Sequence, residues 1–307
     1  MEKHKIVIAG GSGMIGRRMT ELLLGRGYEV WWLSRSGSSH PGVQTAMWDP
    51  LIGKIEARSM ENAYAVLNLA GEGIADGRWT HDRKQNIIHS RTDSTRLLAQ
   101  TMEAQPVSPK VFIAASASGF YGNRGDEILT EDSPPGLSSF HSQSVVEIEE
   151  VISDLIPYDI RTIIPRFGAV LSNDGGALPR LVAPLKYGIA GYMGHGRQWM
   201  PWIHIDDVCH FLITAIEDSA FQGIYNVTSP HPVTNKSFIT TLRKTYQPYS
   251  ILVPVPAFAL RMVFGEMADT ILDSAKVVPE RLSRSSFEFR FPEIRKALEN
   301  LQLQGRI

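Results

Sequence analysis

The chain has 307 residues, of which 43% are hydrophobic and 21% are charged, as in soluble globular proteins. This composition excludes extensive disorder, and the length suffices for one large or two small domains. The 31 lysines and arginines nearly balance the 32 aspartates and glutamates, and no basic tract occurs, so we expect no nucleic-acid partner. The single cysteine, Cys209, excludes an internal disulfide and a cysteine-based zinc site.

No stretch has the length of a signal-peptide core or of a membrane span. The apolar run Ile6–Ala9 leads directly into glycines, and the run Ile251–Phe264 is interrupted by two prolines and by Arg261. We therefore expect a soluble, cytoplasmic protein without a membrane partner.

Short apolar runs alternate with longer amphipathic segments along most of the chain. Strands are predicted at Lys5–Ala9, Tyr28–Leu33, a run ending near Trp48, Ala65–Leu69, Val111–Ala115, Thr162–Ile164 and Ile224–Val227. Helices are predicted at Met14–Arg26, Thr80–Glu103, Ser142–Leu155 and Asp206–Glu217. This alternation is typical of an α/β fold with a doubly wound parallel sheet that helices cover on both faces.

The pattern loosens after Pro165, where glycine and proline become more frequent. Two prolines flanking His231 indicate a boundary. We divide the chain into a nucleotide-binding domain at 1–230, with substrate-side loops at about 166–203, and a small, mostly helical domain at 231–307. The small domain is expected to cap the carboxyl edge of the sheet.

A glycine-rich turn joins the first predicted strand to the first predicted helix. Gly10 permits a tight turn, Gly13 lets the backbone approach a pyrophosphate, and Gly16 allows close packing of helix and strand. The free N–H groups where the helix begins, at Met14 and Ile15, suit phosphate oxygens. A merely flexible turn is the alternative, but the strand before it and the helix after it favour a dinucleotide site.

The end of the second predicted strand selects the dinucleotide. An NAD site usually has Asp or Glu there, whereas this chain has Ser34 and Arg35, at the start of a loop predicted at Ser34–Ser39. A hydroxyl and a guanidinium suit a 2′-phosphate, so the sequence predicts NADP as the cofactor. The alternative is that Arg35 is a solvated loop residue.

Later segments carry a combination of family landmarks. They are Asn68-Leu69-Ala70-Gly71, Ser116 to Gly122, Trp202 to Val208, and Tyr225-Asn226-Val227. With the glycine turn, they resemble the extended short-chain dehydrogenase/reductases, the group of nucleotide-sugar epimerases and dehydratases. The resemblance implies an extended Rossmann fold.

A narrower set of motifs includes Glu72, Arg78-Trp79, Ser90-Arg91, Gly196 to Trp199 and Gly265-Glu266-Met267. These resemble an atypical epimerase family subgroup with a short C-terminal domain of unknown function. The resemblance implies NADP as the cofactor. It also implies further cofactor-binding residues, namely Asn68, Leu69, Ala70, Gly71, Glu72, Arg91 and Ser116. It implies no particular substrate.

The usual catalytic pair of the larger family is missing. Typical members have Tyr-x-x-x-Lys on the helix after the fifth strand, and the tyrosine exchanges a proton with the substrate. Counting to that helix leads to Phe140 and Ser144, and Ala117 stands where a catalytic Ser or Thr is usual. A phenyl ring exchanges no proton, so a non-standard proton relay is required.

Tyr121 and His204 are the candidates for that relay. Tyr121 follows the fifth strand, and a cation, Arg91 or Arg166, is expected to lower the pKa of its phenol. Packing of the tyrosine ring over the cofactor is an equally good interpretation. His204 is the second candidate because imidazole titrates near neutral pH.

Arg166, Gln198 and Trp199 lie in the loop-rich region where open α/β sheets bind ligands. They are predicted to bind a small-molecule substrate that is anionic or carries a ring, for example a sugar nucleotide; domain packing is the alternative. We expect no metal site. Although Asp206 and His210 are four residues apart, an aspartate there is better interpreted as a helix N-cap.

Two functions remain open. The first is an NADP-dependent oxidoreductase or epimerase-like enzyme with a non-standard catalytic site. The second is a catalytically inactive NADP-binding sensor or regulatory protein, which the missing catalytic positions favour. A homodimer is one expected assembly.

Overall fold

The computed structural model describes residues 4–37, 40–157 and 159–305. Its main sheet contains β1 (Lys5–Ala9), β2 (Glu29–Ser34), β3 (Val43–Asp49), β4 (Lys54–Ile55), β5 (Ala63–Asn68), β6 (Val111–Ala114), β7 (Ser116–Ala117), β9 (Arg161–Phe167) and β15 (Gly223–Val227). The strand order is β15-β9-β6-β5-β1-β2-β3-β4, and β7 pairs with β9. All pairs are parallel except β3 with β4, so the predicted doubly wound parallel sheet is confirmed.

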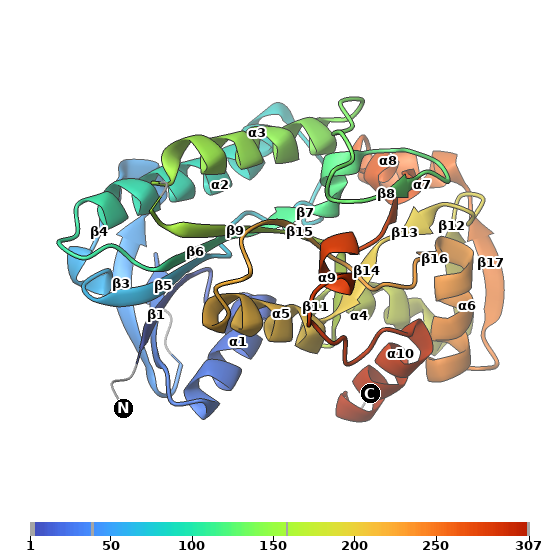
Figure 1. The fold of residues 1–307 in the computed structure, drawn as a ribbon. Coiled ribbons are helices and arrows are strands. Elements are labelled where there is room, and N and C mark those ends of the chain that lie inside the picture. The colour runs from blue at the N-terminus through green and yellow to red at the C-terminus, as the bar shows by residue number, and fades with distance from the viewer. Residues whose placement is uncertain (1–3, 38–39, 158, 306–307) are drawn as a thin grey trace.

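Four helices cover the two faces of the sheet. Helices α2 (His81–Glu103) and α3 (Phe140–Leu155) lie on one face, and α1 (Met14–Gly25) and α5 (Ile205–Glu217) lie on the other (Figure 1). Strand β1 is buried on both sides, as the uninterrupted apolar run Ile6–Ala9 predicts.

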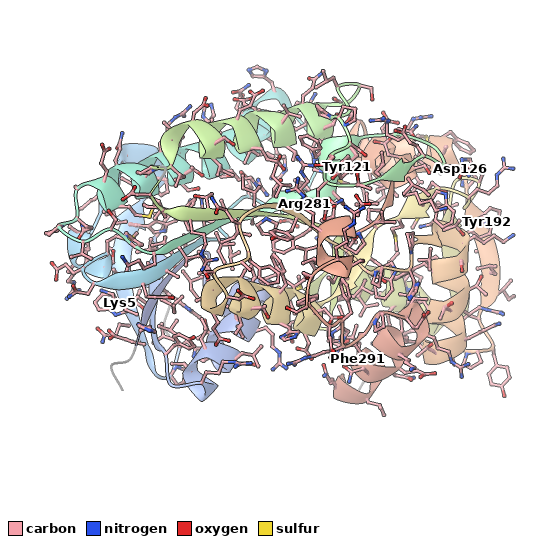
Figure 2. All side chains as sticks on the ribbon, in the orientation of Figure 1. Lys5, Tyr121, Asp126, Tyr192, Arg281 and Phe291 are labelled. Carbon is pink, nitrogen blue, oxygen red and sulfur yellow. The ribbon has the colours of Figure 1, made fainter. Side chains whose placement is uncertain are left out.

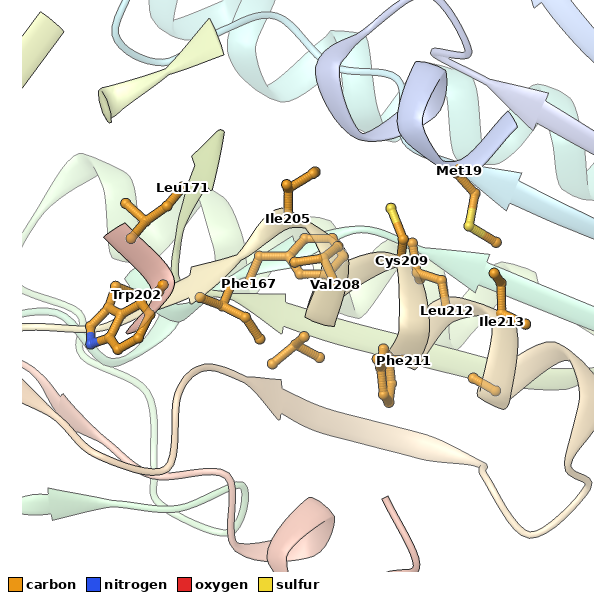
Figure 3. Packing of buried hydrophobic residues seen from close by; sticks show 14 of the residues in the cluster. Met19, Phe167, Leu171, Trp202, Ile205, Val208, Cys209, Phe211, Leu212 and Ile213 are labelled. Atoms are coloured by element: carbon orange, nitrogen blue, oxygen red, sulfur yellow. The ribbon is translucent and has the colours of Figure 1, made fainter. Parts of the chain in front are cut away.

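Successive side chains of β1 join two different cores, because neighbouring residues of a strand point to opposite faces. Ile6 and Ile8 pack in the core that contains α1 and α5, while Val7 and Ala9 pack in the core beneath α2 and α3. Figure 3 shows Val208 and Leu212 of α5 within the first of these cores.

The sheet reverses its winding between β1 and β5. From β1 the chain builds outward through β2 and β3, and it then returns to place β5 on the other side of β1. In such sheets the carboxyl ends of the strands on either side of the reversal diverge and leave a crevice. The glycine turn after β1 and the Leu69–Gly71 segment after β5 therefore lie at the position where a ligand is expected.

The remaining strands form small sheets beyond the main one. They are β8 (Ile128–Leu129), β10 (Ala169–Ser172), β11 (Gly175–Gly176), β12 (Ile189–Met193), β13 (Trp199–Met200), β14 (Trp202–His204), β16 (Val233–Thr234), β17 (Ile251–Val255) and β18 (Lys276–Val277). The additional helices are α4 (Ala177–Val182), α6 (Asn235–Tyr246), α7 (Ala257–Phe264), α8 (Met267–Leu272), α9 (Glu280–Ser283) and α10 (Ile294–Gln304).

The chain after residue 230 is mostly helical, as predicted, but it also contains β17, which pairs in parallel with β12. Pro254 lies within β17, and proline is tolerated because both strands of this two-stranded sheet are edges. Strand β16 likewise pairs with β13. The division of the chain at residue 230 stays a proposal, and both pairings cross it.

Among the described residues, no helix combines the length and the apolar character that crossing a bilayer requires.

Candidate functional site

Three of the glycines in the turn, Gly10, Gly13 and Gly16, are glycine for different structural reasons. Gly10 has φ +80°, and a Cβ there would lie 2.7 Å from the backbone of Leu69. A Cβ on Gly16 would lie 2.4 Å from the carbonyl oxygen of Gly10. Gly13 has an ordinary φ of −72°, and its nearest neighbour would be that same oxygen at 3.2 Å. The fold itself thus requires Gly10 and Gly16, whereas a Cβ on Gly13 would make one close contact and, its chain neighbours aside, meet no other atom of the described residues within 4 Å.

The beginning of α1 offers backbone donors beside this turn. Gly13 is the N-cap residue and makes no side-chain cap, so the first N–H groups of the helix, including those of Met14 and Ile15, have no intrahelical partner. These donors and the positive end of the helix dipole suit an anion. The turn thus fits the phosphates of a dinucleotide.

Ser34 and Arg35 end β2 at the same edge of the sheet. The Ser34 hydroxyl accepts a hydrogen bond from the backbone N–H of Ser36, and the Arg35 side chain is exposed. Residues 38 and 39 of the predicted loop lie outside the described residues.

Asn68 shapes the segment that follows β5. Its side-chain amide donates to the hydroxyls of Ser94 and Thr95 at 3.0 and 3.1 Å, and its Oδ1 accepts from the N–H of Ala70. Asn68 itself is buried, so it orients the adjacent backbone.

A cavity of about 190 Å³ lies beside this segment. Its walls are Leu69, Ala70, Gly71, Ile74, Ile87, Arg91, Ala115, Ser116, Ala117, His141, Ser144, Val145, Ile148 and Phe167. We call it the inner cavity. It brings together five residues that the sequence assigned to the cofactor, namely Leu69, Ala70, Gly71, Arg91 and Ser116.

Arg91 places a positive charge at the inner cavity. Its guanidinium donates to the carbonyl oxygens of Ile87 and Glu72, and burial lowers its pKa. The Glu72 carboxylate instead forms an ion pair with Arg83 at 2.8 Å. Within the described parts of the chain Arg91 has no carboxylate partner, so an anionic group near it would be stabilised.

The ring that reaches the inner cavity from α3 belongs to His141. It is one position after Phe140, the residue that the sequence analysis placed at the position of the family's catalytic tyrosine. Helical periodicity places His141, Ser144, Val145 and Ile148 on the face that lines this cavity. Phe140 faces another direction and packs edge-on against Trp79, at 5.1 Å between ring centroids. Of the two positions counted from the sequence, Ser144 lines the inner cavity and Phe140 does not, and His141, which the sequence analysis did not single out, lines it instead.

Tyr121 does not line this cavity. It is fully buried in the interior (Figure 2), where its hydroxyl donates to the Thr130 carbonyl or Asn226 Oδ1 and accepts from Arg166 at 2.9 Å. Burial raises the pKa of Tyr121, and the nearby Arg166 offsets this only in part. The expectation that a cation lowers this pKa below its ordinary value is therefore wrong.

Arg166 is committed to an internal ion pair. Its Nε and Nη2 donate to the two carboxylate oxygens of Glu149 at 2.8 and 2.7 Å, and its side chain is 3% exposed. Ser116 also donates to Glu149, at 2.5 Å. Arg166 is therefore held inside the protein, since Nε, Nη1 and Nη2 each already donate to a described residue.

His204 serves the fold through one ring nitrogen. It is the N-cap of α5, where its Nδ1 accepts from the N–H of Asp206, while its Nε2 is buried without a hydrogen-bond partner among the described residues. Its ring packs on Phe291 at 4.1 Å between centroids. The N-cap is therefore His204, and neither aspartate. Asp206 pairs with Arg18, and no metal-binding group of three or more such side chains occurs in the described parts of the chain.

Gln198 and Trp199 also lie away from the inner cavity. Gln198 is buried and donates to the Met193 carbonyl, whereas the Trp199 indole donates to Asp126. These contacts correspond to the packing alternative that the sequence left open for this region.

A larger cavity of about 680 Å³ lies on the other side of Phe140. Its walls are Trp79, Asn123, Ser138, Ser139, Phe140, Gly194, His195, Ala257, Arg261, Glu266, Asp269, Thr270, Leu272 and Asp273. We call it the outer cavity. Glu266 pairs with Lys84 and Asp269 pairs with Arg261, whereas Asp273 forms no ion pair with the described residues. Burial and the neighbouring Asp269 raise the pKa of Asp273 to about 6.

Replacing Asp273 by asparagine is expected to stabilise the protein at pH 7.5. The pKa of Asp273 is higher in the folded protein than in the unfolded chain. Between about pH 4 and 6 the folded protein therefore keeps a proton on this carboxyl that the unfolded chain has lost, and the free energy of unfolding falls as the pH rises through this range. The Asp273→Asn gain should be about 1 kcal/mol after allowance for solvent screening, and should shrink towards pH 4.5. Urea unfolding at both pH values measures it; a loss of stability at pH 7.5 would contradict it.

Residues 6–228 match the pattern of the NAD dependent epimerase/dehydratase family, and residues 255–301 match a domain of unknown function, DUF1731. The chain belongs to the NAD dependent epimerase/dehydratase family. The resemblance to the epimerase family subgroup and its C-terminal domain is thus confirmed.

Individual relatives agree with this assignment. An epimerase family protein of Staphylococcus saprophyticus is 34% identical over 302 residues, which cover 97% of this chain and 99% of the relative. Human epimerase family protein SDR39U1, crystallised with NADPH, is 32% identical with a TM-score of 0.88, over 97% and 98% of the two chains. UDP-glucuronic acid 4-epimerase from Bacillus cereus, solved with UDP-glucuronic acid and NAD, shares the fold at 16% identity, with a TM-score of 0.78 over 98% and 99%.

Proposed function

We propose that this epimerase family protein binds NADP(H) along the crevice between β1 and β5 and catalyses an oxidoreductase or epimerase-like reaction on a small molecule. The observation that carries the proposal is the uncapped N-terminus of α1, whose first backbone N–H groups lie at the same sheet edge as the inner cavity. The human relative crystallised with NADPH supports it.

Separate groups of residues would hold the parts of the cofactor. The backbone of Gly13, Met14 and Ile15 would bind the phosphates, and Ser34 with Arg35 would bind the 2′-phosphate. Leu69 to Gly71, Arg91 and Ser116 would surround the nicotinamide end at the inner cavity. The bound cofactor would supply a donor or acceptor of hydride.

Arg35→Ala should weaken NADPH binding by about 10- to 150-fold, equivalent to about 1.5–3 kcal/mol for a lost charge-assisted contact. NADH binding should be unchanged because NADH has no 2′-phosphate. Calorimetric titration of both cofactors measures this. Arg96 is also exposed and lies on α2, so Arg96→Ala serves as the control for the loss of one positive charge. If Arg35→Ala and Arg96→Ala lose the same affinity for NADPH, the role of Arg35 is refuted.

We propose that the substrate enters through the outer cavity. The rings of Trp79 and Phe140 suit a sugar or another ring, but the charged groups do not suit a diphosphate. Arg261 and Lys84 are already paired with carboxylates, and Asp273 would repel an anion. This charge balance favours an uncharged polyhydroxylated substrate over the predicted sugar nucleotide.

The experiment that tests the enzyme proposal follows the absorbance of the nicotinamide with a panel of carbonyl compounds, free sugars and sugar nucleotides. Turnover with an uncharged member and a weaker response to nucleotides would support the proposal. Tight NADPH binding without turnover across the panel would favour the alternative, an inactive NADP-binding sensor.

A further inference from the structure

His141 is a buried imidazole that directly lines the inner cavity. It lies in the first turn of α3, and the residue is 8% exposed. Its backbone carbonyl accepts a hydrogen bond from the Ser144 hydroxyl, and among the described residues no hydrogen bond reaches either ring nitrogen. A buried imidazole without a partner, at the wall of a cavity, has hydrogen-bonding capacity that a ligand can use.

The surroundings fix the ring in this position. A Cβ on Gly119 would lie 2.0 Å from Nε2 of His141, so only glycine leaves room for the imidazole. The Trp79 ring lies 6.3 Å from it, between centroids. Trp79 and Phe140 line the outer cavity and His141 lines the inner cavity, so these three neighbouring rings lie where the proposed substrate entrance approaches the inner cavity.

Burial, together with the positive charge of Arg91, lowers the pKa of His141 to about 4. The ring is therefore neutral near pH 7, with one N–H donor and one nitrogen lone pair. A neutral imidazole can accept a proton from an alcohol as it is oxidised, and the imidazolium so formed can return the proton in the reverse direction.

We propose that His141 is the proton-transfer residue of this site, replacing Tyr121 and His204, and that it acts on the hydroxyl or carbonyl oxygen of the substrate. This inference rests on the proposed function. In alcohol oxidation the O–H bond breaks and its proton passes to the free nitrogen lone pair of His141. The carbon loses hydrogen with two electrons, as hydride, to the oxidised nicotinamide cofactor, while the C=O bond forms.

The first test locates His141 relative to the cofactor without any turnover. Imidazole nitrogens of the ¹⁵N-labelled full chain are observed by NMR during titration with NADP⁺, and His141→Phe assigns the signal. The His141 signal should shift at saturation, while that of His89, which is exposed on α2, should not. If fluorescence shows that cofactor binds and the His141 signal does not move, the inference is overturned and the proposed function stands.

The second test separates proton transfer from packing. With a substrate from the panel, His141→Phe should lower kcat by about 10²–10⁴-fold, the usual contribution of a general acid or base. Cofactor affinity should be unchanged because the ring volume is retained, and the exposed control His89→Phe should behave as the wild type. Wild-type turnover by a folded His141→Phe would overturn the inference. If the wild type does not bind NADPH, the proposed function itself is refuted.

Discussion

Replacing Glu149 by glutamine is expected to reduce the free energy of unfolding by about 3 kcal/mol or more, because it removes the negative charge that neutralises a buried guanidinium. Both side chains of the Glu149–Arg166 pair are at most 8% exposed, at an N–O distance of 2.7 Å. The Arg166 guanidinium also lies 3.4 Å from the centre of the Phe120 ring, so it cannot simply turn into solvent.

The matched control is Glu299→Gln. Glu299 pairs with Arg295 across one turn of α10, and both side chains are well exposed, so this pair should contribute about 0.5 kcal/mol or less. Urea unfolding of the two variants beside the wild type gives both values. If Glu149→Gln is no less stable than Glu299→Gln, the ion pair does not have the structural role assigned to Arg166.

Gly13→Val is expected to abolish measurable NADPH binding while the protein stays folded. The φ of −72° is allowed for valine, and the nearest protein atom to a new Cβ is the Gly10 carbonyl oxygen at 3.2 Å. The side chain would instead occupy the space in which the phosphates must approach the backbone. Circular dichroism reports the fold and fluorescence titration reports binding.

Gly25→Val is the matched control for this glycine replacement. Gly25 lies at the other end of α1, and a Cβ there would meet no atom within 4 Å. The Gly25→Val variant should bind NADPH as the wild type does. Wild-type binding by Gly13→Val would show that the turn is not the phosphate site, and unfolding of Gly13→Val alone would show that the residue has a packing role.

The elements that could be predicted from the sequence are those whose pattern is local. The run Ile6–Ala9 is apolar at every position because both faces of β1 are covered, and the glycine spacing follows it directly. Strand β17 was missed because its stability comes from pairing with β12, about sixty residues earlier, and because Pro254 suggested irregular chain.

The candidate site was predicted less well because side-chain direction depends on helix phase. A shift of one residue turns a helical side chain by about 100°, which separates Phe140 at the outer cavity from His141 at the inner cavity. The sequence does carry a signal for where α3 begins, since Ser139 and Ser142 form a capping box at its N-terminus. Arg166 was predicted to bind the substrate and Tyr121 to transfer a proton because the sequence does not reveal their long-range partners. Arg166 pairs with Glu149, and the Tyr121 hydroxyl bonds to Asn226.

Titration of the unmodified full chain with NADPH and with NADH tests the central claim most directly. The account predicts saturable binding of one NADPH per chain, with a Kd at least about tenfold below that for NADH, since the 2′-phosphate adds a charge-assisted contact. Equal affinity for the two cofactors, or no binding of either, would contradict it.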